Sequence, residues 1–336
     1  MQSILVTGGA GFIGSNFVRY MLKKYPSYRI IVLDALTYAG NRANLTDLEK
    51  NPRFFFYHGN ICDRSVVDNL VSNVDAVINF AAETHVDRSI HEADSFAQTD
   101  VLGTMVLLEA AKKYNIARYL QISTDEVYGS IENGEFTEEH SLSPNSPYSA
   151  SKAGGDMMVR AYHKTYGVPT LITRASNNYG PYQYPEKLIP LFVTNALDNI
   201  PVPLYGDGMN VRDWLYVEDH CSAVDYVLHH GVIGEVYNIG GGNERTNVTI
   251  THTILKALNK PESLIKRVAD RPGHDRRYAV DTSKVRRLGW KPAYNFEEAI
   301  VETIQWYVKN ESWWRAIKEK QKAFQEFMKK NYEDRK

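Results

Sequence analysis

A glycine-rich turn near the N-terminus places the strongest constraint on how this chain can fold. The apolar run at residues 3–7 leads directly into GGAGFIG at 8–14, and a helix is expected from Ser15. Glycines in such a turn let the backbone approach a pyrophosphate, whose charge is stabilised by the free N–H groups at a helix N-terminus. Asp34 ends the next apolar run, at the position where a ribose diol would be bound. Because its carboxylate would repel a 2′-phosphate, the sequence predicts a site for NAD rather than NADP.

Short apolar runs alternate with longer helical stretches through the first half of the chain. The runs cover residues 3–7, 29–34, 54–58, 76–80, 119–123 and 170–173. This rhythm is typical of βαβ units, and the runs are apolar throughout because helices cover both faces of such a sheet. We therefore predict an α/β fold with a Rossmann-like, doubly wound parallel sheet. The small residues Ala81 and Ala82 follow the fourth run, where larger side chains would collide with a bound dinucleotide.

The character of the sequence changes after Asn177. Five prolines fall between positions 181 and 203, and a Gly-Asp-Gly turn follows at 206–208. Proline at this density breaks long helices and indicates loop-rich architecture. We expect residues 1–177, with returns near 211–240, to form an NAD-binding domain, and residues 178–210 and 241–336 to form a smaller mixed α/β substrate-binding domain. The Lys- and Glu-rich tail at 312–336 is predicted to be one amphipathic surface helix.

Charge and cysteine content argue against several other classes of protein. The 336 residues carry 39 basic and 40 acidic side chains, so no overall field would draw the chain to nucleic acid or to an anionic membrane. No apolar run approaches the roughly 20 residues that span a bilayer. The two cysteines, Cys62 and Cys221, indicate neither a disulfide framework nor a thiolate metal site. We expect a cytoplasmic protein that binds no metal.

A tyrosine and a lysine lie four positions apart, at Tyr148 and Lys152, on one face of an expected helix. A tyrosine, whose ordinary pKa is about 10, can act as a base near neutrality only beside a cation. Lys152 and an oxidised nicotinamide would supply that charge. Thr124, which follows the run at 119–123, is positioned to hydrogen-bond a substrate hydroxyl. Such a Tyr–Lys pair is common on helix surfaces, but here it follows the glycine-rich turn in the order expected of a hydride-transfer site.

Longer motifs resemble those of the extended short-chain dehydrogenases. They are GGAGFIG at 8–14, NFAAETHVDRS at 79–89, ISTDEVYG at 122–129 and YSASK at 148–152. Further motifs look like those of the dTDP-glucose 4,6-dehydratases within that family: SNNYGPYQYPEKLIP from 176, RDWLYVEDH from 212, YNIGG from 237, RPGHDRRYAVD from 271 and NYE at 331–333. The resemblance implies oxidation of a nucleotide sugar at C4 by enzyme-bound NAD, loss of water across C5 and C6, and return of the hydride to C6. The product would be dTDP-4-keto-6-deoxyglucose.

The same resemblance implies a role for each residue at the reacting centre. Sugar-nucleotide epimerases of this fold typically have small, non-ionisable residues at the positions of Asp125 and Glu126, since oxidation and reduction at C4 need no further acid or base. Dehydration needs both. Glu126 is the implied base at C5 and Asp125 the implied acid at O6. The expected catalytic residues are Thr124, Asp125, Glu126, Tyr148 and Lys152.

Binding residues are implied in the same way. Those for the cofactor are Gly8, Gly11, Phe12, Ile13, Gly14, Asp34, Leu36, Thr37, Asn60, Ile61, Ala81, Ala82, Thr99, Tyr148, Lys152 and Asn177. Those for the substrate are Thr84, His85, Thr124, Asn177, Glu186, Lys187, Leu188, Pro203, Tyr205, Arg212, Asn247, Arg271, His274 and Tyr332. Lys187, Arg212, Arg271 and His274 would supply the local positive charge that a diphosphate needs. Asn60 departs from the aspartate usual in these dehydratases, although its amide oxygen can still accept a hydrogen bond from the adenine amino group.

Rival interpretations stay open at this point. The chain could act on a different nucleotide sugar, as a 4,6-dehydratase or a 4-epimerase, and sequence physics does not distinguish thymine from uracil. A non-catalytic NAD-sensing protein is the alternative from another class, and the intact Thr124, Tyr148 and Lys152 argue against it. The helices near 95–114 and 148–166 are expected to form a four-helix interface in a homodimer, because the second carries Met157, Met158 and Ala161 besides its catalytic face.

Overall fold

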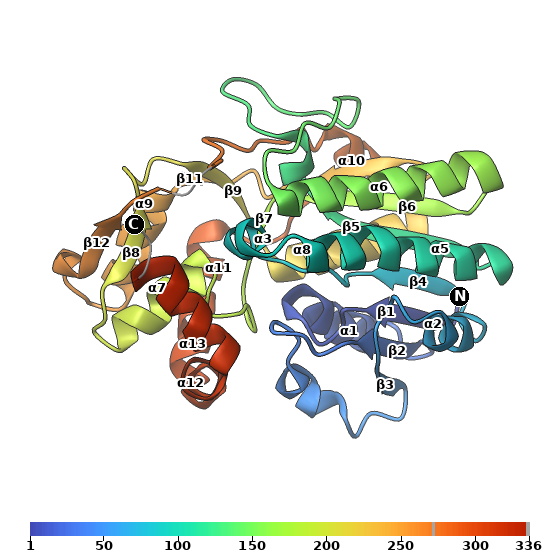
Figure 1. The fold of residues 1–336 in the computed structure, drawn as a ribbon, viewed down its shortest axis with the longest axis horizontal. Coiled ribbons are helices and arrows are strands. Elements are labelled where there is room, and N and C mark those ends of the chain that lie inside the picture. Colours follow the sequence, from blue (N-terminus) through green and yellow to red (C-terminus); the bar gives the residue numbers. More distant parts are fainter. Residues whose placement is uncertain (271–272, 334–336) are drawn as a thin grey trace.

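A seven-stranded sheet forms the larger half of the computed structural model, which describes residues 1–270 and 273–333 (Figure 1). Its strands lie in the order β10-β6-β5-β4-β1-β2-β3, and each neighbouring pair is parallel. The bounds are β1 (Ser3–Thr7), β2 (Arg29–Asp34), β3 (Phe54–His58), β4 (Ala76–Asn79), β5 (Arg118–Thr124), β6 (Thr170–Ala175) and β10 (Val236–Ile239). The predicted Rossmann-like fold is confirmed, and β10 adds a seventh strand to the six expected.

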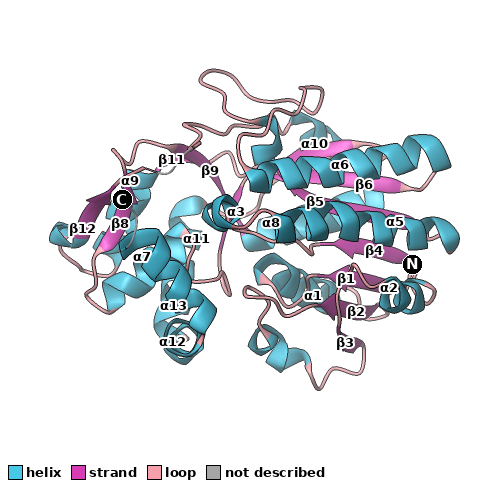
Figure 2. Cartoon of the chain, in the orientation of Figure 1, coloured by secondary structure: helices cyan, strands magenta, loops and turns pink. Residues whose placement is uncertain are grey.

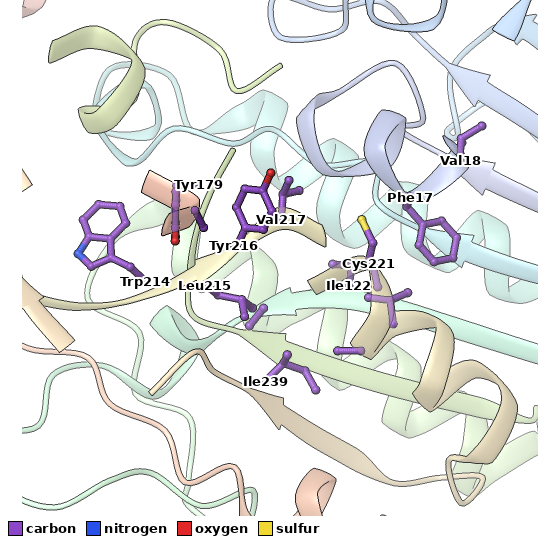
Figure 3. Packing of buried hydrophobic residues seen from close by; sticks show 14 of the residues in the cluster. Phe17, Val18, Ile122, Tyr179, Trp214, Leu215, Tyr216, Val217, Cys221 and Ile239 are labelled. Atoms are coloured by element: carbon purple, nitrogen blue, oxygen red, sulfur yellow. The ribbon is translucent and has the colours of Figure 1, made fainter. Parts of the chain in front are cut away.

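Helices cover both faces of this sheet (Figures 1 and 2). One face carries α1 (Phe12–Lys24) and α8 (Val217–His230), and the other carries α2 (Arg64–Val71), α5 (Thr104–Lys113) and α6 (Pro147–Tyr166). Side chains alternate across a strand, so Ile4 of β1 is buried in the cluster with α1, whereas Leu5 is buried in the cluster with α5. Figure 3 shows the first cluster, where Phe17, Cys221 and Ile122 lie together. Burial on both faces explains why the strands are apolar throughout.

Short strands and the later helices form the smaller half. A three-stranded sheet contains β7 (Asn177–Tyr179), β9 (Val211–Tyr216) and β11 (Glu244–Thr246), and β8 (Val202–Tyr205) pairs with β12 (Ile265–Val268). The helices α7 (Leu188–Leu197), α9 (Asn247–Ala257), α11 (Phe296–Lys309), α12 (Glu311–Lys320) and α13 (Lys322–Met328) belong to this half (Figure 1). Segments near 211–240 were expected to return to the NAD-binding domain. Of these, α8 and β10 pack with the large sheet, whereas β9 pairs only within the small sheet.

The helix α10 (Ser283–Leu288) packs beside β10. Earlier in the chain, three short helical segments lie between β4 and α5: α3 (Val86–His91), α4 (Asp94–Ala97) and a π-helical turn at Gln98–Gly103. The last two run directly into α5, so the expected helix near 95–114 contains a local change of winding. No helix in residues 1–270 and 273–333 is long and apolar enough to cross a membrane.

The prediction of one surface helix for the tail is wrong. The described part of the tail is divided into α12, α13 and a π-helical turn at Lys329–Glu333. Trp314, Ile317, Phe324 and Phe327 of this segment are each at most 5% exposed. Trp314 and Ile317 lie three residues apart on α12, and Phe324 and Phe327 lie three residues apart on α13, so each pair shares one face of its helix. The abundance of Lys and Glu concealed these two apolar faces, which pack against the rest of the protein.

Candidate active site

A cavity of about 280 Å³ lies at the carboxyl ends of the large sheet, and the turns after β1 and β4 contribute to its wall. In open parallel sheets, ligands bind in the crevice where the strand order reverses, which here falls between β1 and β4. A Cβ atom on Gly8 would lie 2.6 Å from the backbone nitrogen of Ala81, and one on Gly14 would lie 2.3 Å from the carbonyl oxygen of Gly8. These positions admit only glycine. Gly11 is the N-cap of α1, which begins at Phe12 rather than at the expected Ser15.

Asp34 connects the end of β2 to the glycine-rich turn. One carboxylate oxygen accepts a hydrogen bond from the N–H of Ala10 and the other accepts one from the N–H of Leu36, each at 2.8 Å. Burial raises the pKa of Asp34, and the two backbone hydrogen bonds oppose that rise. Asp34 therefore supports the turn as well as lining the cavity. Leu36, predicted to contact the cofactor, does not line the cavity; with φ of 50°, it packs against the core.

The C-terminal helices reach the same turn through a chain of hydrogen bonds. The indole N–H of Trp313 donates to the side-chain oxygen of Asn44 at 2.8 Å, and the Asn44 amide donates to the carbonyl oxygen of Ala10 at 2.9 Å. At the cavity rim, the Tyr184 hydroxyl donates to the side-chain oxygen of Gln321 at 2.7 Å. The tail thus helps to hold both the glycine-rich turn and one wall of the cavity.

The start of α6 positions Tyr148 and Lys152. Ser146 and Ser149 form a reciprocal capping box around Pro147, which fixes where this helix begins. The ammonium of Lys152, on the same face one turn later, donates to the carbonyl oxygen of Ile122 at 2.8 Å. Burial, followed by the charges of Glu126, Asp100 and Asp125, holds the pKa of Tyr148 well above its ordinary value. Tyr148 is therefore protonated near neutrality, and it needs further positive charge nearby to act as a base.

The end of β5 brings three polar side chains to the cavity. The Thr124 hydroxyl accepts from the N–H of Glu126 at 3.3 Å and donates to Asp125 Oδ1 at 3.2 Å. Asp125 is 2% exposed, and its Oδ2 atom has no hydrogen-bond partner among the described residues. Burial and the neighbouring Glu126 raise the pKa of Asp125 well above its ordinary value. Asp125 therefore holds a proton more readily than an exposed aspartate does, which suits a group that must donate one.

The predicted residues divide according to whether they line the cavity. All five expected catalytic residues do so, as do all expected cofactor residues except Leu36. From the expected substrate set, Thr84, Thr124, Asn177 and Lys187 line it. Arg271 lies outside the described residues. The cavity wall does not include His85, Glu186, Leu188, Pro203, Tyr205, Arg212, Asn247, His274 and Tyr332.

The residues away from the wall have other contacts. Glu186 forms a buried ion pair with Arg88 at 2.8 Å. Arg212 is 5% exposed and donates to the carbonyl oxygens of Val211 and Asp275. Tyr205 stacks on Tyr332 and meets His274 edge-on, which gives a separate aromatic cluster. Their predicted role in substrate binding therefore stays a prediction.

Two cavity residues with strong electrostatic signatures were missed from the sequence. Burial, followed by the charge of Asp100, raises the pKa of Glu83 to about 7. Glu83 directly follows Ala81 and Ala82, which were predicted to contact the cofactor, so its position in the sequence could have indicated that it lines the cavity. Burial lowers the pKa of His220 to about 3, and one ring nitrogen pairs with Asn178 at 2.9 Å. His220 ends the motif RDWLYVEDH from 212, which was a local signal, but only the packing of α8 brings it to the cavity from a distant segment.

Comparison with known proteins decides the family. Residues 5–303 match the family described as GDP-mannose 4,6 dehydratase. The chain belongs to this dehydratase family. A dTDP-glucose 4,6-dehydratase from Streptomyces niveus is 51% identical over 325 residues, covering 95% of this chain and 97% of the relative. The predicted membership among the dTDP-glucose 4,6-dehydratases is thereby confirmed.

Solved structures of a dehydratase and of an epimerase are both similar to this fold. A dTDP-glucose 4,6-dehydratase from Streptomyces venezuelae, solved with NAD and TYD bound, has a TM-score of 0.93 and 52% identity, covering 94% of this dehydratase and 100% of that chain. A UDP-glucuronic acid 4-epimerase from Bacillus cereus has a TM-score of 0.87 and 28% identity, covering 92% and 99%. Dehydratases and epimerases thus share the fold, so the reaction must be argued from the side chains in the cavity.

Proposed function

We propose that the chain is a dTDP-glucose 4,6-dehydratase that works with bound NAD. The observation that carries the proposal is the pair Asp125 and Glu126 on the same cavity wall as Thr124, Tyr148 and Lys152. An oxidation site needs only the last three residues. A buried acid beside a second carboxyl group adds the proton transfers that elimination of water requires.

The residues around the glycine-rich turn fit a dinucleotide. Gly8 and Gly14 leave a space that a Cβ atom would fill, and the first amides of α1 have no partners within the helix. Asp34 lies where it can accept hydrogen bonds from a ribose diol while repelling a 2′-phosphate. NAD, when bound, would accept a hydride from C4 of the sugar and later return it to C6.

The protein's own groups would then move the protons. Tyr148, beside Lys152 and Thr124, takes the proton of the C4 hydroxyl as C4 becomes a ketone. The ketone acidifies the C5 proton, which Glu126 removes. Asp125 gives its proton to the C6 hydroxyl, which leaves as water and produces a C5–C6 double bond. After hydride addition at C6, Glu126 returns a proton to C5, and the cofactor is not consumed.

Two other functions explain fewer of the residues that line the cavity. A 4-epimerase would have no use for a buried acid and base beside Thr124. A non-catalytic NAD sensor would have no use for a phenol and ammonium held at the carboxyl end of the sheet. The choice of dTDP rather than another nucleotide rests on the similarity at 51% identity over nearly the whole chain.

The test is incubation of the purified protein with dTDP-glucose, UDP-glucose and GDP-mannose separately, followed by mass spectrometry. We expect loss of one water molecule and a new ketone, fastest with dTDP-glucose. Glu126→Gln serves as a control for dehydratase activity from a contaminating enzyme, since this variant itself should be strongly impaired. A product of unchanged mass that is the C4 epimer would overturn the dehydratase assignment, whereas faster dehydration of another nucleotide sugar would overturn only the choice of dTDP.

We also propose a homodimer formed through α5 and α6. Leu102, Met157 and Tyr166 of this region are 43%, 45% and 54% exposed, so this surface presents large apolar side chains that a second copy of the chain would cover. Light scattering should give a dimer mass, and Met157→Glu should shift it toward the monomer. Val301→Glu is a matched control, because Val301 is 47% exposed on α11. A monomer mass for the unmodified protein at micromolar concentration would contradict the proposal.

A cytoplasmic setting is proposed from the cysteines. Cys62 and Cys221 are both free thiols, which suits a reducing compartment. Fractionation of the source cells should place the protein with cytoplasmic markers. Recovery mainly with secreted protein would contradict this.

A further inference from the structure

Tyr128 ends the turn that carries the two carboxyl groups assigned to the loss of water. This single turn of 3₁₀-helix spans Asp125–Tyr128 and follows β5 directly. Its backbone is closed where the carbonyl oxygen of Glu126 accepts from the N–H of Gly129 at 3.2 Å. A helical turn this short has little stability of its own. The placement of its side chains therefore depends on what holds its last residue.

The Tyr128 side chain is 2% exposed, and its hydroxyl group makes two hydrogen bonds. It accepts from Arg174 Nη1 at 2.8 Å, because a guanidinium can only donate, and it gives its own proton to Asn238 Oδ1 at 2.8 Å. The Asn238 side-chain nitrogen donates to the carbonyl oxygen of Phe136 at 2.9 Å, which leaves the amide oxygen for Tyr128. Phe136 also stacks on the Tyr128 ring, with centroids 5.1 Å apart. The hydroxyl is thus held from two sides, with each donor matched to an acceptor.

Arg174 is itself fixed on its far side. It is 4% exposed, and its Nε atom donates to Asp156 Oδ2 on α6 at 2.9 Å, so its charge is paired inside the protein. Its guanidinium also lies 4.8 Å from the centre of the Tyr128 ring. Asp156 and Arg174 line a second cavity of about 100 Å³ and not the active-site cavity, and Tyr128 lines neither of the two. A change in this series of contacts therefore removes no group of the active-site wall.

The residues assigned to the oxidation step are held by different contacts. Thr124 pairs with Ala175 in the parallel register of β5 and β6. Lys152 on α6 donates to the carbonyl oxygen of Ile122 at 2.8 Å. Both contacts are made without the Tyr128 hydroxyl, so its removal should disturb the turn and leave the oxidation groups in place.

We propose that Tyr128 is a positioning residue for the loss of water. Its hydroxyl group, held by Arg174 and Asn238, fixes the end of the turn. The fixed turn keeps Asp125 and Glu126 at the cavity wall, where a small displacement of an acid or a base is costly. The inference rests on the proposed function, since it requires these two carboxyl groups to catalyse the elimination.

The experiment replaces Tyr128 by phenylalanine, which keeps the ring and removes only the hydroxyl group. Rapid mixing with dTDP-glucose measures the NADH phase and the elimination step separately. In Tyr128→Phe, elimination should slow by about 10- to 100-fold, since a displacement of about 1 Å can cost that much. The NADH phase should keep the rate of the unmodified protein.

Tyr119→Phe is the matched control. Tyr119 is also buried, and its hydroxyl donates to a side-chain carbonyl oxygen, that of Gln121, at 2.9 Å. It lies near the start of β5, at the opposite end of the strand from the turn. Both phases should therefore keep their rates in this variant. The same selective loss of elimination in Tyr119→Phe would overturn the proposal.

Two other kinetic results would also overturn it. Equal slowing of both steps in Tyr128→Phe would indicate a general loss of active protein, and an unchanged elimination rate would show that the hydroxyl has no such role. Arg174→Lys is the second variant if Tyr128→Phe does not fold, because lysine keeps a positive charge for Asp156 but lacks the second arm that reaches Tyr128. It should show the same selective slowing. Failure of both variants to fold would assign these residues to stability alone and would contradict the positioning role.

Amide hydrogen exchange gives a readout that needs no turnover. In the protein without substrate, Tyr128→Phe should raise the exchange rate over residues 125–129 by about tenfold, because a buried hydrogen bond that holds the turn has been lost. Residues 118–123 of β5 should exchange as before. Unchanged exchange over 125–129 would overturn the proposal. Absence of a 4-keto product from the unmodified protein would instead refute the proposed function, without altering the exchange result.

Discussion

Replacing Glu126 by glutamine should separate the oxidation of the sugar from the loss of water. The change keeps the shape of the side chain and leaves the backbone hydrogen bond from Glu126 to Thr124 in place. Tyr148 and Lys152 belong to α6, so both side chains of the oxidation machinery remain in place. Loss of the Glu126 charge removes the base at C5 and also lowers the pKa of Tyr148, which favours rather than hinders the oxidation step.

The size of the effect follows from what a positioned base contributes. Loss of such a group costs about 100- to 10,000-fold, or about 3 to 5 kcal/mol in the barrier to elimination. NADH and a 4-keto-glucose species should therefore accumulate on Glu126→Gln before water leaves. Asp125→Asn should behave more mildly, since water can still protonate the departing hydroxyl. Tyr148→Phe is the matched control, in which neither NADH nor product should form at a useful rate.

The assay is rapid mixing with dTDP-glucose, following NADH absorbance, with exchange of the C5 hydrogen measured in heavy water. Glu126→Gln should show an NADH phase, slow product formation and little exchange at C5. Elimination at the unmodified rate in this variant would refute the assigned role of Glu126. Loss of the NADH phase in Glu126→Gln as well as in Tyr148→Phe would show that the two half-reactions do not depend on separate residues.

Three further outcomes are expected. Gly14→Ala should weaken NAD binding by about tenfold or more, because its Cβ would lie 2.3 Å from the carbonyl oxygen of Gly8. Calorimetry measures the affinity, and an unchanged affinity would contradict the assignment of the glycine-rich turn to the dinucleotide. Asp34→Ala should weaken NAD binding with little gain for NADP. The melting temperature of this variant should also fall, because two backbone N–H groups lose their acceptor. Asp34→Asn keeps an acceptor and should melt at a higher temperature than Asp34→Ala. Hydrogen bonding to Asp225 raises the pKa of His229, so this histidine's contribution is fully present below about pH 6.5 and lost as pH rises through the folded-state pKa. Denaturant unfolding should show a smaller loss of stability between mildly acidic and mildly alkaline pH in His229→Gln than in the unmodified protein, and equal losses would contradict this.

The large sheet could be predicted because its signals are local. Each of the six apolar runs is short and bounded by helical stretches, and all six form strands. The glycine-rich turn, Asp34, and the pairs Asp125-Glu126 and Tyr148-Lys152 are likewise local patterns attached to strand or helix ends. The rules for parallel sheets then place strand ends at one edge, which brings these residues to one cavity.

The missed features depend on packing between distant segments. His220 ends the motif RDWLYVEDH, but it reaches the cavity because α8 packs beside α1, and the motif alone does not give that packing. The division of the tail into two helices depends on the surface that receives Trp314 and Phe324. The resemblance and its charge assigned Arg212 to a diphosphate, which stays a prediction, and the structure shows its guanidinium donating to the carbonyl oxygens of Val211 and Asp275. Charge in a sequence does not give the direction of a side chain.

The hydrogen bond between Trp313 and Asn44 also has a consequence for the order of assembly. Its partners are 269 positions apart, and Asn331 meets Asp87 across 244 positions. Contacts of such separation form late, because the entropy of closing a long loop must first be overcome. The β1–α1 unit can fold early during synthesis, yet Ala10 receives its Asn44–Trp313 support only after α12 has emerged and docked. We therefore expect a growing chain to acquire its sheet well before it can retain a dinucleotide.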